Sequence, residues 1–69
     1  MDSRDLIVCD PEILMGKPTI RGTRISVELI LGWLGAGRPI EQILENYPQI
    51  RHDDVLAALH FASGKLAGR

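Results

Sequence analysis

The 69-residue chain has a single cysteine, Cys9, and only three aromatic residues, one each of Trp, Tyr and Phe. One cysteine excludes an internal disulfide framework and is typical of a reducing compartment. The apolar runs are too short to span a bilayer and no signal-peptide pattern opens the chain, so we expect a cytoplasmic protein. Because aromatic residues are scarce and 45% of the residues are hydrophobic, we expect an aliphatic core.

The chain also lacks an excess of positive charge, since its net charge is −1 at pH 7. A DNA-binding domain usually carries a domain-wide cationic excess. Within residues 16–38, however, four basic residues accompany one acidic residue, a local charge of +3, while the rest has four basic and eight acidic residues, a charge of −4. We therefore expect any contact with DNA to come from this local patch, repeated in a dimer.

The most distinctive segment is residues 16–25, which read GKPTIRGTRI and run into an apolar stretch. Gly22 and Thr23 favour the tip of a small hairpin, whose flanking residues Ile20 and Ile25 we expect to point inward. Ser26 offers a side-chain oxygen to cap a helix that begins at the next residue. The segment also concentrates three cations without an acid: Lys17, Arg21 and Arg24.

The patterning predicts one domain, residues 1–69, of mainly α class. An N-terminal arm (residues 1–25) holds a short strand at 6–9 and the hairpin, and residues 26–67 form a three-helix bundle. We expect the helices at 27–36, 39–46 and 52–65, with Pro39 as the first residue of the second helix and Tyr47–Pro48 ending it. The last two helices and their short connection predict a helix-turn-helix.

Four basic residues are the candidate contacts to DNA phosphates or to acidic groups of a partner: Lys17, Arg21, Arg24 and Arg51. Guanidinium groups suit both kinds of acceptor. The alternative is that the cations of the 16–25 segment pair internally with Asp10, Glu12 or Glu28. The sequence leaves both interpretations open.

The first predicted helix is apolar over an arc of roughly 220°, about twice the stripe that a one-sided surface helix needs. A domain this small rarely stabilises itself by its own core alone. We therefore expect a homodimer that buries Leu29, Trp33 or Ala36. The alternative is that the N-terminal strand and hairpin cover the second apolar side.

The third predicted helix begins with Asp53 and Asp54, which complement the helix dipole but repel phosphate where a recognition helix approaches DNA. Its core stripe is expected to be Val55, Leu59, Ala62 and Leu66. On the opposite face we expect a smooth surface for a protein partner: Ala57, Phe61 and Gly64. The alternative is that Phe61 packs under the N-terminal strand.

Catalysis is not expected. His52 and His60 are eight residues apart, too far for the pair that chelates a metal from one helical face, and no phosphate-binding glycine loop is present. The adjacent Asp53 and Asp54 point to different sides and do not form an acid–base pair. The sequence predicts no cofactor, no metal, no small-molecule substrate and no membrane contact.

Several blocks of this sequence together resemble one known family. They are Gly16-Lys17-Pro18, Ile20-Arg21-Gly22-Thr23-Arg24-Ile25, Ile43-Leu44 followed by Tyr47-Pro48, and Asp54-Val55 with Ala57-Ala58-Leu59. Over residues 5–66 the chain is similar to the domain-of-unknown-function 433 family. Arg38 and Arg51 depart from that pattern, because the family usually has Ser or Thr helix caps there.

The resemblance implies a homeodomain-like helix-turn-helix preceded by short strands. It also implies an antitoxin of the VapB type that binds a PIN-like ribonuclease toxin, with operator DNA as a second candidate ligand. A protein-interaction module without DNA binding and a stand-alone transcriptional regulator are the alternatives. Because little chain follows the third helix, the long tail with which some antitoxins wrap a toxin is not expected.

Overall fold

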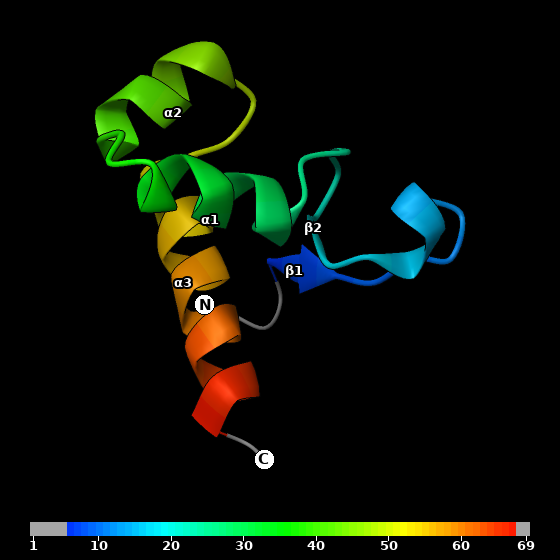
Figure 1. Ribbon diagram of the computed structural model, residues 1–69. Coiled ribbons are helices and arrows are strands. Elements are labelled where there is room, and N and C mark those ends of the chain that lie inside the picture. The colour runs from blue at the N-terminus through cyan, green and yellow to red at the C-terminus, as the bar shows by residue number, and fades with distance from the viewer. Residues whose placement is uncertain (1–5, 68–69) are drawn as a thin grey trace.

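Three helices form the body of the domain, and a short two-stranded sheet lies beside them (Figure 1). The computed structural model describes residues 6–67, and the side chains of residues 6–64. The strands are β1 (Ile7–Val8) and β2 (Thr19–Ile20), a single helical turn is η2 (Leu14–Gly16), and the helices are α1 (Val27–Gly35), α2 (Ile40–Asn46) and α3 (His52–Ala67). The predicted fold class is confirmed.

The extended part of the arm centres on β2, which has a neighbour on each side. β1 pairs with it antiparallel, with Ile7 opposite Ile20. On the other side Thr19 is bridged to Ser26, and the Ile20 N–H donates to the Ile25 carbonyl oxygen at 2.9 Å. Ile20 and Ile25 are both buried, which confirms the inward orientation predicted for them.

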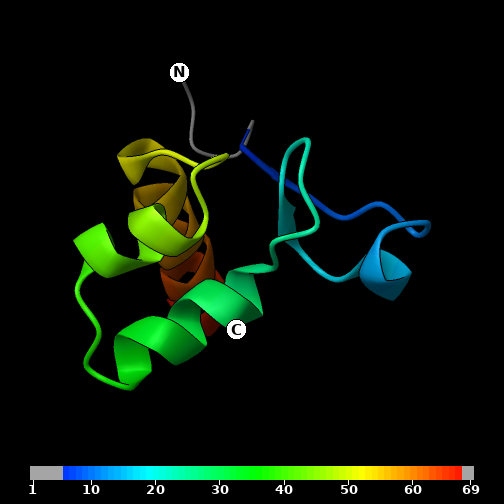
Figure 2. The same cartoon turned by 90° about the horizontal axis from the view of Figure 1, so that it is seen from above.

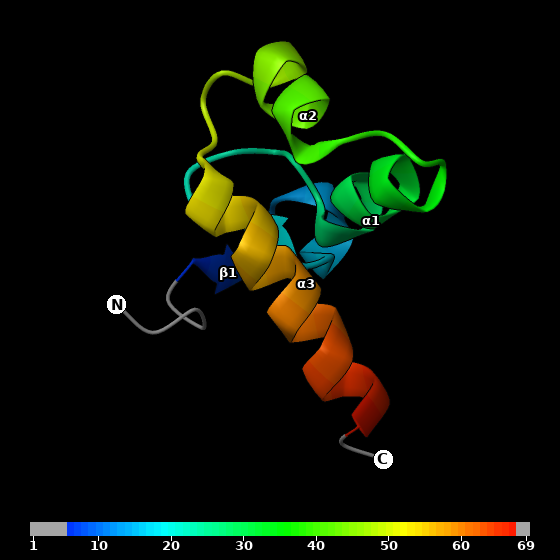
Figure 3. The same ribbon diagram turned by 90° about the vertical axis from the view of Figure 1, so that its left-hand side faces the viewer.

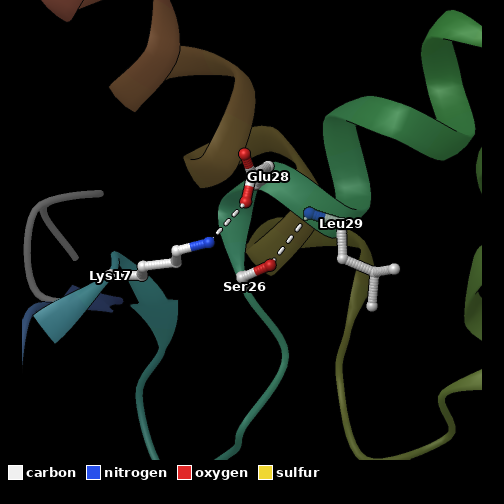
Figure 4. Close-up of polar contacts among 4 residues, drawn as sticks. All are labelled: Lys17, Ser26, Glu28 and Leu29. Atoms are coloured by element: carbon white, nitrogen blue, oxygen red, sulfur yellow. Dashed lines mark hydrogen bonds and ion pairs between the residues drawn. The ribbon is translucent and has the colours of Figure 1, made fainter. Parts of the chain in front are cut away.

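Helix α1 begins at the predicted residue and ends at Gly35, one residue before the predicted end, and each end is closed by hydrogen bonds. The Ser26 hydroxyl accepts from the Leu29 N–H at 2.9 Å, an N-cap (Figure 4). After the helix Gly37 has a φ of 87°, its N–H donates to the Leu34 carbonyl at 3.0 Å, and the Arg38 N–H donates to the Trp33 carbonyl at 3.1 Å. This is a Schellman ending, which favours glycine at the left-handed position.

The second and third helices start without a side-chain cap of the usual kind. α2 starts at Ile40, one residue later than predicted, because Pro39 is its N-cap rather than its first helical residue, and Pro39 makes no side-chain cap bond. At the start of α3 the Asp54 carboxylate accepts from the Arg51 N–H at 2.8 Å. That bond is the half of a capping box that satisfies the N–H of the N-cap residue.

The core lies where α3 meets α1, α2 and β1. Figure 2 shows the arm to one side of the helices with η2 at its outer end, and Figures 1 and 3 show α3 continuing past the other elements at its C-terminal end. No aromatic side chain is fully buried among the described residues, so the expected aliphatic core is confirmed. The buried hydrophobic residues are Ile7, Ile20, Ile25, Val27, Ile30, Ile43, Ile50, Val55, Ala57 and Ala58.

Candidate binding surfaces

A tight reversal of the chain at residues 21–24, here called the basic turn, presents two arginines. Gly22 has a φ of 79°, a conformation that glycine adopts without penalty. The Thr23 hydroxyl donates to the Ile20 carbonyl at 2.9 Å and accepts from the Ile25 N–H at 3.0 Å. Arg21 and Arg24 are exposed on either side of the glycine and threonine, so a fixed backbone positions both cations.

Lys17 has an internal partner, as the alternative interpretation of the sequence proposed. Its Nζ lies 3.2 Å from the Glu28 carboxylate, an ion pair between the arm and the first turn of α1 (Figure 4). Both side chains are well exposed to solvent. Such a pair contributes at most about 1 kcal/mol, so water or another charged group can replace either partner readily.

Arg51 lies apart from the Lys17–Glu28 pair, at the start of α3. The start of α3 borders a half-open hollow of about 650 Å³, here called the acidic groove. Its lining residues are Leu6, Arg51, Asp53, Asp54, Leu56, Ala57 and His60. The structure thus does not gather Lys17 and Arg51 in one site, and Arg51 sits beside two carboxylates.

A second hollow, here called the apolar groove, lies between the arm, α1 and α3. Its volume is about 460 Å³, and its surface is mostly apolar. Lys17 and Glu28 supply its charged atoms, while the remaining lining residues are Pro18, Val27, Leu31, Phe61 and Ala62. The sequence did not predict this groove, because its walls come from three separate segments.

The surface predicted on α3 for a protein partner is only partly present. Ala57 is 2% exposed, so its placement on the partner face is wrong. Phe61 is half-buried and packs against the core, whereas Gly64 is exposed. Ala57 is buried because three elements, β1, α1 and α2, pack against α3. The buried face of α3 is therefore wider than a single stripe.

The large apolar residues that α3 exposes to solvent are two leucines outside the predicted partner surface. Leu59, predicted in the core stripe, is 39% exposed, and Leu56, which the sequence did not single out, is 45% exposed. Val55 is fully buried, as the stripe predicted, and so is Ala58, which the stripe left out. The buried face is therefore shifted from the predicted stripe toward Ala57 and Ala58, while Val55 belongs to both. The adjacent pair Ala57–Ala58 was the available signal, since small residues permit close packing of helices and strands.

The predicted dimer surface on α1 is partly occupied by the chain itself. Trp33 is half-buried, and its ring meets that of Tyr47 edge-on with 5.7 Å between centroids. The Arg38 guanidinium lies 4.9 Å from the centre of the Trp33 ring, within cation–π range. Leu29 is 36% exposed and Ala36 is exposed. A dimer through these three residues stays a prediction.

One further exposed apolar feature was absent from the sequence reasoning. In η2 both Leu14 and Met15 have positive φ, 51° and 58°, and Gly16 follows with 86°. Met15 is 92% exposed and Leu14 is 39% exposed. Three successive left-handed residues, two of them bulky, are uncommon in any sequence.

Two further features, a metal-binding cluster and a membrane-spanning helix, are absent from residues 6–67. Within residues 6–67, no three His, Cys, Asp or Glu side chains lie close enough together to bind a metal ion. No helix in the same range has both the length and the apolar character needed to cross a membrane.

Comparison with known proteins identifies the family. A family model described as a protein of unknown function, DUF433, matches residues 7–62, from the first strand into the second half of α3. The chain belongs to the DUF433 family. The resemblance seen in the blocks around the basic turn is thereby confirmed, and the match includes both the arm and the helix-turn-helix.

Two proteins that are similar to this chain are both longer than it is. The uncharacterized protein y4eO of Sinorhizobium fredii is 32% identical over 68 residues, which cover 97% of this chain and 31% of that protein. The crystal structure of a DUF433 member from Anabaena variabilis matches with a TM-score of 0.86 at 29% identity, covering 94% of this chain and 64% of that one. This chain therefore spans less than a third of the curated relative and less than two thirds of the structural one.

Proposed function

We propose that this DUF433 domain is a non-enzymatic, antitoxin-like regulator that binds a PIN-like toxin through the outer face of α3. The observation that carries the proposal is the exposure of Leu56 and Leu59 on that helix, the second helix of the helix-turn-helix. Large apolar side chains on an exposed helical face mark a protein-binding surface more often than a nucleic-acid surface.

The charges around α3 favour a protein partner over a DNA groove. Recognition helices approach DNA with their N-terminal residues, close to the phosphates. Here that end carries Asp53 and Asp54, one of which is held in place by its bond to the Arg51 backbone. The resulting negative potential opposes phosphate but suits a basic segment of a protein.

The acidic groove gives this partner surface its chemistry. Leu56 and Ala57 form apolar wall, while Asp53 and Asp54 supply carboxylates beside it. An arginine or lysine side chain packs its aliphatic stem on apolar surface and keeps its charged end near acceptors. We therefore expect the contacting segment of the partner to combine apolar and basic residues.

The test is to read the genes on either side of this one and to co-express the chain with any PIN-like protein that they encode. We expect the pair to co-purify and growth inhibition by the toxin to be relieved. The double variant Leu56→Lys, Leu59→Lys should weaken binding at least about thirtyfold, the effect of losing a buried anchor of about 2 kcal/mol. Its helical circular-dichroism signal should stay intact, because both side chains are exposed.

Leu29→Lys is the matched control, because Leu29 is a helical leucine of similar exposure on α1. It should bind the toxin normally. Equal losses in the control and the double variant, or the absence of any complex with the wild type, would contradict α3 as the partner surface.

Operator binding is the second candidate function, and the exposed Arg24 on the basic turn favours it. Among residues 6–67, Arg24 forms no ion pair. Binding to a DNA fragment from upstream of the gene should then weaken with salt, with a log–log slope of about one unit per phosphate contact. Arg24→Ala should lower that slope, whereas Arg38→Ala, which removes a cation stacked on Trp33, should leave it unchanged. A wild type that shifts no such fragment at low salt would rule this function out.

A further inference from the structure

The arm carries a protruding apolar knob that its own chain does not cover. Met15 is the middle residue of η2 and is 92% exposed, and η2 stands at the outer end of the arm (Figures 1 and 2). Its neighbour Leu14 is also exposed, and both have left-handed backbone conformations that L-residues adopt rarely. Strained backbone of this kind persists in proteins mainly at binding sites and other functional positions.

The apolar groove lies next to this knob along the chain. Lys17 and Pro18 line the groove and follow η2 directly, so the knob and the groove share one segment of the arm. The groove holds about 460 Å³, within the range of sites that take small ligands, and so has room for a methionine side chain. Its inner wall is Leu31, Phe61 and Ala62, which are apolar and half-buried.

We propose that two copies of this chain form a two-fold dimer in which Met15 of each copy inserts into the apolar groove of the other. A two-fold interface is self-complementary, so each surface must present both the knob and its receptor. Because both features lie on the same stretch of the arm, one axis passing between them brings both contacts together at once.

The charges at the groove fit the same arrangement. Lys17 lies two residues after Met15, and Glu28 stands on the rim of the groove. When Met15 of one copy enters the groove of the other, Lys17 of the first copy reaches the rim where Glu28 of the second copy stands. The exposed ion pair within each copy can thus exchange for two pairs between copies, with no charge left unpaired.

The area that a dimer needs also favours two contacts over one. A standard interface takes about 800 Å² from each partner, about a sixth of the 4848 Å² surface of this chain. One methionine in one groove covers far less than that. Two reciprocal contacts, together with Leu14 and the charged rims between them, extend the interface across the whole outer side of the arm.

This dimer is independent of the proposed toxin-binding face, since it uses the arm and the apolar groove rather than Leu56 and Leu59. It also differs from the dimer predicted through Leu29, Trp33 and Ala36 on α1. The test therefore measures self-association of the purified chain alone, by sedimentation over a concentration series.

Met15→Gly removes the knob and places a residue that tolerates the left-handed conformation. It should weaken self-association roughly tenfold or more while leaving the fold at least as stable. Ala62→Leu should do the same by filling the groove, whereas Ser63→Leu adds the same side chain at an exposed neighbour outside the groove and should not. Leu29→Lys should leave the dimer intact.

Mixing the two disabled variants is the decisive step. The Met15→Gly protein keeps an open groove and the Ala62→Leu protein keeps its knob, so an equimolar mixture retains one of the two contacts. The mixture should associate more tightly than either variant alone. A monomeric wild type, a dimer that survives Met15→Gly, or a mixture no tighter than its components would overturn the proposal.

Discussion

The two turns of the arm reverse the chain in different ways. The basic turn needs one positive φ, which falls on Gly22, and the Thr23 hydroxyl closes it with two hydrogen bonds. In η2 three successive residues have positive φ, and only the last is glycine. Its closing bonds are from backbone alone, from the Gly16 N–H to the Ile13 carbonyl at 3.1 Å and from the Lys17 N–H to the Leu14 carbonyl at 3.2 Å.

The residues of the basic turn account for its backbone conformation, whereas the residues of η2 do not account for theirs. Each bulky residue in the left-handed region costs about 1–2 kcal/mol. The basic turn avoids that cost and gains side-chain bonds, whereas η2 accepts it twice and exposes Met15 besides. The basic turn is thus specified locally, while η2 has a conformational cost that its own side chains do not offset.

The largest effect is expected from disabling the side chain that closes the basic turn. Thr23→Val keeps the shape but leaves the Ile25 N–H without its acceptor, so it should lower the free energy of unfolding by about 2 kcal/mol. In a domain of this size the midpoint temperature should fall by roughly 10 °C. Thr23→Ser retains the hydroxyl and should lose less than half as much; equal losses would mean that the two hydrogen bonds contribute nothing.

A smaller effect is expected at the glycine of the same turn. Gly22→Ala forces a side chain into the left-handed region and should lower stability by about 1 kcal/mol, measured by urea unfolding. Gly32→Ala is the matched control. It makes the same chemical change in the middle of α1, where nothing lies within 4 Å, and should raise stability by up to about 1 kcal/mol. The same sign at both positions would contradict the backbone explanation.

The smallest effect has the opposite sign and concerns η2. Met15→Gly relieves one strained residue but adds glycine's entropy in the unfolded chain, so stability should rise by about 0.5 kcal/mol. The measurement requires protein dilute enough to be monomeric. Ser63→Gly, on the exposed face of α3, introduces the same residue into a helix and should lower stability by a similar amount. A loss at Met15 as large as that at Ser63 would show that η2 carries no strain.

The sequence predicted those parts of the fold that depend on neighbours along the chain. Ser26 and Tyr47–Pro48 marked helix ends because capping and proline restrictions act within a few residues. The partners of the candidate site residues could not be derived from neighbours along the chain. Lys17 had two open interpretations, and only the approach of α1 to the arm placed Glu28 within 3.2 Å of it.

Periodicity alone did not determine which face of α3 is buried. Val55, Ala58 and Leu59 are all apolar, so periodicity alone allows several buried stripes. The predicted stripe included Leu59 and left out Ala58. The structure buries Ala57 and Ala58 instead, because β1 and α1 pack against the helix from sides that the helix sequence does not record. Small residues allow that close approach, while Leu56 and Leu59 are left on the surface.

By itself the sequence determined the family, the order of the strands and of the three α-helices, the helix ends to within about two residues and the place of the basic turn, because each depends on short-range chemistry. Only the tertiary structure decided which leucines of α3 meet solvent, where the two grooves lie and that Met15 is exposed. Those features are made by segments distant in the chain, and their burial is fixed by how whole elements pack rather than by the residues of any one of them.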